Sequence, residues 1–196
     1  MTGLFFGSFN PIHNGHLIIA NCMQQYAGLK QVWFVVSPQN PFKEKATLLN
    51  QYDRLHLVKL SIENNSKLKA SDIEFNLPQP NYTIDTLTYL TEKYPARKFA
   101  LIMGSDNLVS FNKWKNYSVI LDNYKILVYH RRGFESNEFL NHPNIQYFNF
   151  PLLDVSSSLI RQMILDKKSV RYLLPDSVLE YINESSLYKK LKSLSK

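Results

Sequence analysis

Two continuous apolar runs constrain the fold of this chain more than any other feature of its sequence. Residues 31–36 read Gln-Val-Trp-Phe-Val-Val, and residues 99–103 read Phe-Ala-Leu-Ile-Met. Strands that are apolar without alternation are buried on both faces, which is typical of parallel sheets covered by helices. Because segments of helical periodicity separate such runs, the sequence predicts an α/β protein with right-handed crossovers and a mainly parallel sheet.

The remaining patterns extend this alternation along the chain. We expect strands at residues 4–6, 31–36, 68–75, 99–103, 124–129 and 145–150. We expect helices at residues 15–26, 51–63, 83–94, 108–111, 117–121, 157–166, 176–183 and 186–194. This order predicts a Rossmann-like, doubly wound sheet in a single domain, residues 1–196, of which residues 155–196 form a helical C-terminal subregion.

The charge balance narrows the class of partner. The formal net charge is +7, from 23 Lys and Arg against 16 Asp and Glu, which suits nucleotides or nucleic acid. The sequence has no repeat of aromatic and basic residues typical of RNA-binding sheets, so we expect no nucleic-acid partner. No apolar stretch approaches the ~20 residues of a membrane helix, and no basic segment precedes the first apolar run. We therefore expect no membrane partner and a cytoplasmic location, which the single cysteine fits.

The loop at residues 7–16 carries the strongest chemical signal. It joins an apolar run to a helical pattern, and a helix N-terminus after a strand favours bound phosphate. It lacks the G-x-G-x-x-G fingerprint, because only Gly7 and Gly15 are present, so a hydride-transferring dinucleotide enzyme is disfavoured. His13 and His16 could be loop and cap residues satisfied by the backbone. Two histidines beside a glycine at such a turn instead favour phosphate chemistry, since imidazoles donate to phosphate oxygens.

Three other segments are expected to meet this loop. Residues 37–43, 104–106 and 130–133 each follow a predicted strand, as residues 7–16 do. In open parallel sheets, ligands bind beyond the carboxyl ends of the strands. The sequence therefore predicts one site built from these four segments.

Residues 7–16 read G-S-F-N-P-I-H-N-G-H and resemble the G-S/T-F-D-P-x-H-x-G-H signature of the H-x-G-H nucleotidyltransferase superfamily. This resemblance implies that a phosphate ester attacks the α-phosphate of a nucleoside triphosphate and that pyrophosphate leaves, usually with Mg²⁺. It implies no covalent enzyme intermediate, so catalysis would come from positioning and charge stabilisation.

Later segments narrow the resemblance to nicotinate-nucleotide adenylyltransferases. Residues 156–161, S-S-S-L-I-R, resemble the family's I-S-S-T-x-I-R, and residues 81–87, N-Y-T-I-D-T-L, resemble S-Y-T-x-x-T-L. Residues 104–108 resemble G-x-D-x-L, and residues 111–115, F-N-K-W-K, resemble F-x-x-W. The family's L-L-P-x-x-V-x-x-Y-I stretch is matched at residues 173–182.

The resemblance implies transfer of the adenylyl group of ATP to nicotinate mononucleotide, giving nicotinate adenine dinucleotide in NAD biosynthesis. The catalytic residues would be His16, His13 and Lys43. The ATP-binding residues would be Gly7, Ser8, Phe9, Gly15, Gly104, Asp106, Ser156, Ser157 and Arg161. The pyridine-nucleotide-binding residues would be Asn40, Thr83, Ile84, Trp114 and Lys115, with Trp114 stacking on the pyridine ring. No metal-ligand set is expected from the protein.

Two positions depart from the family pattern, and two other functions stay open. Asn10 stands where the signature has Asp, and Phe42 stands where the family has His. A sister enzyme, phosphopantetheine adenylyltransferase or a cytidylyltransferase, shares the first motif. A non-catalytic nucleotide- or nucleic-acid-binding module would fit the positive charge but would leave the two histidines without a purpose. The partners expected are small-molecule substrates, with a homo-oligomer open.

Overall fold

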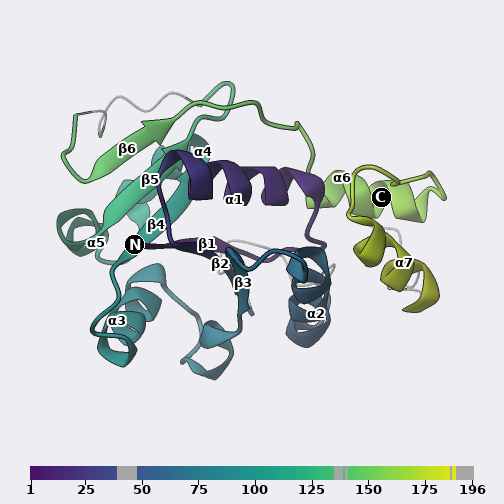
Figure 1. Cartoon of the computed structure of the whole chain (residues 1–196), viewed down its shortest axis with the longest axis horizontal. Coiled ribbons are helices and arrows are strands. Elements are labelled where there is room, and N and C mark those ends of the chain that lie inside the picture. Colours follow the sequence, from purple (N-terminus) through teal and green to yellow (C-terminus); the bar gives the residue numbers. More distant parts are fainter. Residues whose placement is uncertain (39–47, 135–138, 140, 186, 189–196) are drawn as a thin grey trace.

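A computed structural model describes residues 1–38, 48–134, 139, 141–185 and 187–188 of the chain. Its six strands form one sheet in the order β3-β2-β1-β4-β5-β6, and every neighbouring pair is parallel. The strands are β1 (Thr2–Gly7), β2 (Gln31–Val36), β3 (Leu68–Ser71), β4 (Phe99–Gly104), β5 (Lys125–Tyr129) and β6 (Ile145–Phe148). The doubly wound, Rossmann-like sheet predicted from the sequence is confirmed (Figure 1).

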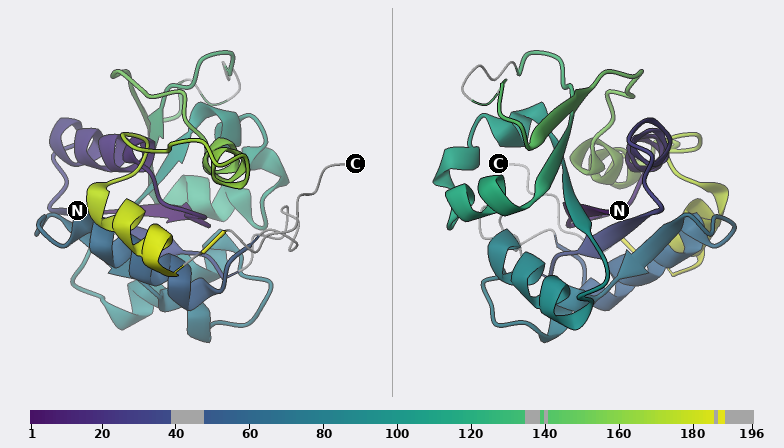
Figure 2. Two further views of the ribbon diagram at one scale, coloured as in Figure 1. Left: turned by 90° about the vertical axis from the view of Figure 1, so that its right-hand side faces the viewer. Right: turned by 60° about the vertical axis from the view of Figure 1, so that its left-hand side comes forward.

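The helices cover both faces of this sheet (Figure 2). They are α1 (Asn14–Tyr26), α2 (Gln51–Ile62), α3 (Thr83–Lys93), α4 (Ser105–Leu108), α5 (Tyr117–Asn123), α6 (Ser157–Leu165) and α7 (Asp176–Ser185). Two 3₁₀ turns are η2 (Ile73–Asn76) and η3 (Phe111–Lys113). Apolar residues of α1, α2, α6 and α7 share one core, and those of α3, α4 and α5 share the other.

The continuous apolar runs are explained by these two cores. Along β1, Leu4 lies in the core beneath α3 and Phe5 lies in the core beneath α1 and α2. Along β2, Trp33 lies in the core beneath α3 and Phe34 lies in the core beneath α1 and α2. Successive side chains of a strand point to opposite faces, so a strand with a core on each side needs an apolar residue at every position.

The structure corrects the sequence prediction for several elements. The helix expected at residues 108–111 is wrong, because α4 ends at Leu108 and the chain turns before η3 begins at Phe111. The expected strand 68–75 stops at residue 71, and the chain turns into η2, where the amide of Phe75 bonds the carbonyl of Asp72. The expected strand 145–150 stops at residue 148. The expected helix 186–194 is wrong at its two described residues, which lie in a turn. Tyr188 has a φ of 70°, a left-handed conformation that no right-handed helix accommodates.

The described part of the C-terminal subregion packs on the rest of the chain. Val178 and Ile182 of α7 are buried in the core shared with β1 and α2. The hydroxyl of Ser177 donates to the carbonyl of Leu60, at 3.2 Å. Among the described helices, none is long and apolar enough to cross a membrane.

Replacing Leu87 with Ala tests the core beneath α3. Leu87 is fully buried there, so the substitution leaves a cavity and should lower the free energy of unfolding by about 2–5 kcal/mol. Urea denaturation followed by circular dichroism measures this change. The neighbouring Thr88 is exposed, and Thr88→Ala is the matched control, which should leave stability nearly unchanged. Equal effects of the two substitutions would contradict the assignment of this face.

Candidate active site

One cavity of about 410 Å³ opens beyond the carboxyl ends of the central strands. All four segments that were predicted to meet, residues 7–16, 37–43, 104–106 and 130–133, contribute at least one described residue to its lining. The site residues predicted from the sequence that line it are Gly7, Ser8, Phe9, His13, Gly15, His16, Thr83, Gly104, Asp106, Trp114, Lys115 and Ser157. Lys43 and Asn40, also predicted, lie outside the described residues.

His13 and His16 meet at the start of α1. His13 is the N-cap of this helix, and its backbone amide donates to Nδ1 of His16 at 3.3 Å. The two rings stack with their centroids 3.7 Å apart. Because Nδ1 of His16 accepts a hydrogen bond, a neutral His16 carries its proton on Nε2, where it is a donor. The rings of Phe5 and Phe9 contact His16 edge-on and fix its orientation.

His13 is held in its neutral form. Burial, and secondarily the positive charge of Arg131, lower the pKa of His13 to about 4. Its Nδ1 is buried and has no hydrogen-bond partner among the described residues. Such an atom in a cavity wall is unsatisfied until a ligand reaches it. At neutral pH His13 is therefore an uncharged hydrogen-bonding group rather than a fixed cation.

Glycines make the space that these side chains occupy. A Cβ on Gly15 would lie 3.0 Å from Nδ1 of His13, and a Cβ on Gly7 would lie 2.8 Å from the ring of Phe9. A Cβ on Gly104 would overlap the carboxylate of Asp106. The loop glycines thus serve side-chain placement, in addition to the close backbone approach expected from the sequence.

Arg131 is a cation of the cavity that the sequence analysis did not single out. Its guanidinium pairs with the Asp106 carboxylate at 2.9 Å, and its backbone amide donates to the hydroxyl of Ser105, also at 2.9 Å. Arg131 follows β5, within the segment 130–133 that was expected to reach the site. An arginine two residues after a buried strand was the signal that could have identified it.

The cavity is also lined by Thr83 at the start of α3 and by Lys113, Trp114 and Lys115 at the end of η3 and just after it. Lys115 forms an ion pair with Asp85 at 2.9 Å and places its ammonium 4.7 Å from the centre of the Tyr82 ring. These contacts tie the segment carrying Trp114 to the first turn of α3, which begins at Thr83. The ring of Trp114 packs edge-on against that of Phe111, with centroids 5.5 Å apart.

The first turn of α3 offers backbone donors to this part of the cavity. The first amides of a helix have no partner within the helix. Thr83 lines the cavity, whereas the side chain of Ile84 is buried in the core. Any contribution of Ile84 to the site therefore comes from its backbone amide.

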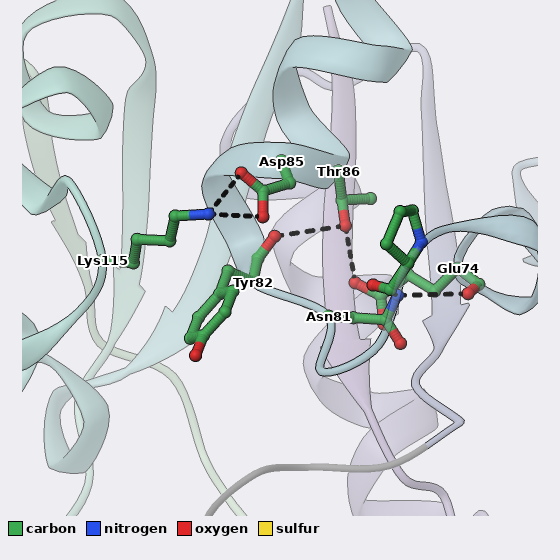
Figure 3. Close-up of polar contacts among 7 residues, drawn as sticks. Glu74, Asn81, Tyr82, Asp85, Thr86 and Lys115 are labelled. Carbon is green, nitrogen blue, oxygen red and sulfur yellow. Dashed lines mark hydrogen bonds and ion pairs between the residues drawn. The ribbon is translucent and has the colours of Figure 1, made fainter.

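Glu74 and Asn81 line the same cavity and were missed in the sequence. Oε1 of Glu74 accepts the hydroxyl of Thr86 at 2.8 Å, and Asn81 donates to the carbonyl of Glu74 at 3.2 Å (Figure 3). Burial raises the pKa of Glu74, against hydrogen bonds from Ser37 and Thr86 that lower it. These contacts hold η2 and the loop before α3 together. Glu74 was hidden because its segment was predicted to be a strand.

The serine-rich start of α6 contacts the histidine loop directly. Ser156 caps the helix by accepting the amide of Leu159 at 3.1 Å. Ser157 donates its hydroxyl to the carbonyl of Pro11, and Arg161 donates to the carbonyl of Asn10, each at 2.8 Å. Ser156 and Arg161 do not line the cavity, whereas Ser157 does. The start of α6 therefore stabilises the position of the histidine loop through these two hydrogen bonds.

The described residues contain no group of three or more His, Cys, Asp or Glu side chains that could hold a metal ion.

Comparisons with known proteins agree with this geometry. The cytidylyltransferase-like family model matches residues 4–163. A protein of Flavobacterium psychrophilum named "Probable nicotinate-nucleotide adenylyltransferase" is 54% identical over 190 residues, which is 96% of this chain and 98% of that protein. A protein of the same name from Bacteroides fragilis is 45% identical over 181 residues, 92% of this chain and 90% of that protein.

Solved structures match the fold at low identity. Plasmodium falciparum nicotinic acid mononucleotide adenylyltransferase, complexed with NaAD, superposes with a TM-score of 0.80 at 20% identity, over 95% of this chain and 96% of that one. The same enzyme complexed with APC gives a TM-score of 0.78 over the same shares of the two chains. Taken together with the sequence relatives, these matches show that the chain belongs to the cytidylyltransferase-like family and, within it, to the nicotinate-nucleotide adenylyltransferases.

Proposed function

We propose that this protein transfers the adenylyl group of ATP to nicotinate mononucleotide and so forms nicotinate adenine dinucleotide in NAD biosynthesis. The observation that carries the proposal is that one cavity is lined by His13, His16, Thr83 and Trp114. We assign the phosphates to the part lined by the histidines, the phosphate end, and the pyridine ring to the part lined by Trp114, the ring-binding end. The curated relatives named for this activity support it.

The reaction is a direct displacement at phosphorus. An oxygen of the nicotinate mononucleotide phosphate forms a bond to the α-phosphorus of ATP, and the bond from that phosphorus to the bridging oxygen breaks, so pyrophosphate leaves. Nε2–H of His16 donates to the α-phosphate oxygens as negative charge builds on them. The N-terminus of α1 adds positive potential there. The charge of Arg131, which also lines the cavity, is largely offset by its ion pair with Asp106.

The remaining predicted residues take supporting roles in this proposal. The backbone amides of Gly7, Ser8 and Phe9 approach the triphosphate. Ser157 also approaches it, and the resemblance alone assigns the same role to Lys43. Gly104 and Asp106 position the nucleotide beyond β4. Mg²⁺ bound to ATP would supply neutralisation of the phosphate charge.

The pyridine end accounts for a preference for the acid over the amide. Trp114 stacks on the ring, and the amides of Thr83, Ile84 and Lys115 receive the nicotinate carboxylate, with Asn40 beside them by resemblance. Backbone N–H groups at a helix N-terminus stabilise an anion. A carboxamide would direct its own N–H groups at these donors or offer them only one oxygen, so nicotinamide mononucleotide binds less well.

We infer also that residues 1–196 form one domain with a helical C-terminal subregion. The burial of Val178 and Ile182 of α7 in the core shared with β1 and α2 supports this inference.

A substrate panel tests the function. With ATP and Mg²⁺, nicotinate mononucleotide should release pyrophosphate much faster than nicotinamide mononucleotide or phosphopantetheine, and coupled pyrophosphatase measures this. CTP in place of ATP is the control for the nucleotide. Preference for phosphopantetheine or for CTP would indicate a sister transferase. No release with any substrate, together with tight nucleic-acid binding, would indicate a binding module.

His16→Ala tests the catalytic group. Loss of a donor to the developing charge should lower kcat by about 10²–10³-fold while the far-ultraviolet circular dichroism stays unchanged. His56→Ala is the control, since His56 lies outside the cavity and contacts Tyr181. Near-normal turnover of purified His16→Ala would refute the catalytic assignment.

Trp114→Ala tests the ring-binding end. Loss of the stacking surface should raise KM for nicotinate mononucleotide about tenfold and leave KM for ATP nearly unchanged. Trp114→Phe keeps an aromatic face and should recover most of the affinity. If both variants raise KM for ATP instead, Trp114 belongs to the other substrate's site.

A further inference from the structure

Asn10, in the middle of the histidine loop, is the point at which three distant segments hold that loop. Its side chain is 4% exposed. Its Oδ1 accepts the backbone amide of Leu49 at 3.3 Å and the hydroxyl of Tyr188 at 3.0 Å. Its backbone carbonyl accepts Arg161 at 2.8 Å. One asparagine is therefore contacted by the segment before α2, by helix α6 and by the chain beyond α7.

The surroundings of Tyr188 keep its hydroxyl neutral, so that it acts as a hydrogen-bond donor. The residue is 2% exposed, and desolvation raises the pKa of its hydroxyl well above the usual range, although the nearby cations of Arg161 and Arg54 act in the opposite direction. A neutral phenol has one O–H, and here it is directed to Asn10. The left-handed backbone of Tyr188 costs about 1 kcal/mol for a residue other than glycine. Such a conformation persists only where the surrounding contacts determine it.

Arg54 continues the same polar layer beneath the loops. Its side chain is fully buried, and its guanidinium donates to the carbonyl oxygens of Leu49, Ser8, Ser37 and Pro38 at 2.6–3.0 Å. Ser8 belongs to the histidine loop, and Ser37 follows β2. Leu49 is shared, since its carbonyl bonds Arg54 and its amide bonds Asn10. Tyr188 thus joins the C-terminal chain to a buried network that sets the relative position of two loops lining the cavity.

We propose that Tyr188 is a positioning residue for adenylyl transfer, because its hydroxyl fixes the histidine loop through Asn10. The inference rests on the proposed function for its kinetic consequence. Only two residues, Pro11 and Ile12, separate Asn10 from His13. A shift of Asn10 is therefore passed to the two histidines. Loss of position by a fraction of an ångström at such groups reduces the rate more than it reduces substrate binding.

The alternative is that Tyr188 merely fills the core. Its ring belongs to the core shared by α1, α2 and α7. Tyr188→Phe separates the two roles, because phenylalanine keeps the ring and removes only the hydroxyl. A residue that only packs would show little change, whereas a positioning residue would lose rate.

The first experiment measures Tyr188→Phe in the full-length chain. We expect kcat to fall about fivefold to tenfold, with KM for both substrates nearly unchanged. We also expect faster amide hydrogen exchange in a peptide covering residues 8–16, with no change across α3. Tyr172→Phe makes the same chemical change at a side chain that is 82% exposed, and it should leave both measurements unchanged.

A double-mutant cycle locates the effect in the bond to Asn10. In an Asn10→Ala background, Tyr188→Phe should change kcat by less than about twofold, because the acceptor is already gone. In an Asn10→Asp background the oxygen is retained, and the effect of Tyr188→Phe should persist. Losses that simply add in the Asn10→Ala background would overturn the proposal, as would Tyr188→Phe with unchanged kcat and unchanged exchange.

The two proposals fail in distinguishable ways. If the wild-type chain releases no pyrophosphate from any substrate, the proposed function fails, and hydrogen exchange of residues 8–16 still decides whether Tyr188 holds the loop. If the wild-type chain is active but Tyr188→Phe matches it in kcat and exchange, only the positioning role is lost.

Discussion

The position of β1, hydrogen-bonded in parallel to β2 on one side and β4 on the other, determines the rest of the site. Parallel pairing places the carboxyl ends of all three strands at one edge, so the segments that follow them must share the same space. The chain uses the segment after β1 for the histidines and the segment after β4 for Asp106. The loops could not meet if any of these strands ran antiparallel, whatever their sequences.

The chemistry at this edge of the sheet depends on which side chains are charged and on how each charge is paired. His13 is held neutral by burial, whereas Arg131 pairs with Asp106 beside it. Arg54 is buried among carbonyl oxygens, which orient it without cancelling its charge. Burial lowers the pKa of Arg54 to about 10, so it stays cationic at neutral pH. The cavity wall therefore carries an uncharged histidine and an arginine that is ion-paired with Asp106, whereas Arg54 lies beneath the loops and fixes their carbonyl groups.

Local patterns in the sequence predicted most of the elements and twelve of the residues that line the cavity, because apolar periodicity and loop motifs are encoded by neighbouring residues. The bounds of β2 follow from its apolar run alone. What the sequence did not reveal is carried by contacts between residues far apart in the chain. Asn10 had no explanation until Tyr188, 178 positions later, was found to donate to it. Glu74 escaped notice because a buried acid has no periodic signature, and the turn at η2 was hidden by the apolar residues around it.

The walls of the ring-binding end are tied by the ion pair between Lys115 and Asp85, whose side chains are 44% and 52% exposed. An exposed pair of this kind contributes only about 0–1 kcal/mol, which is close to thermal energy. A dinucleotide that fills both ends of the cavity must leave before the next turnover begins. Breaking this ion pair frees the Lys115 side chain at little cost, while Phe111 of η3 stays in the same buried core as Ile84 and Leu87 of α3. Departure of the larger product then does not require the sheet, or the buried layer under the histidines, to move.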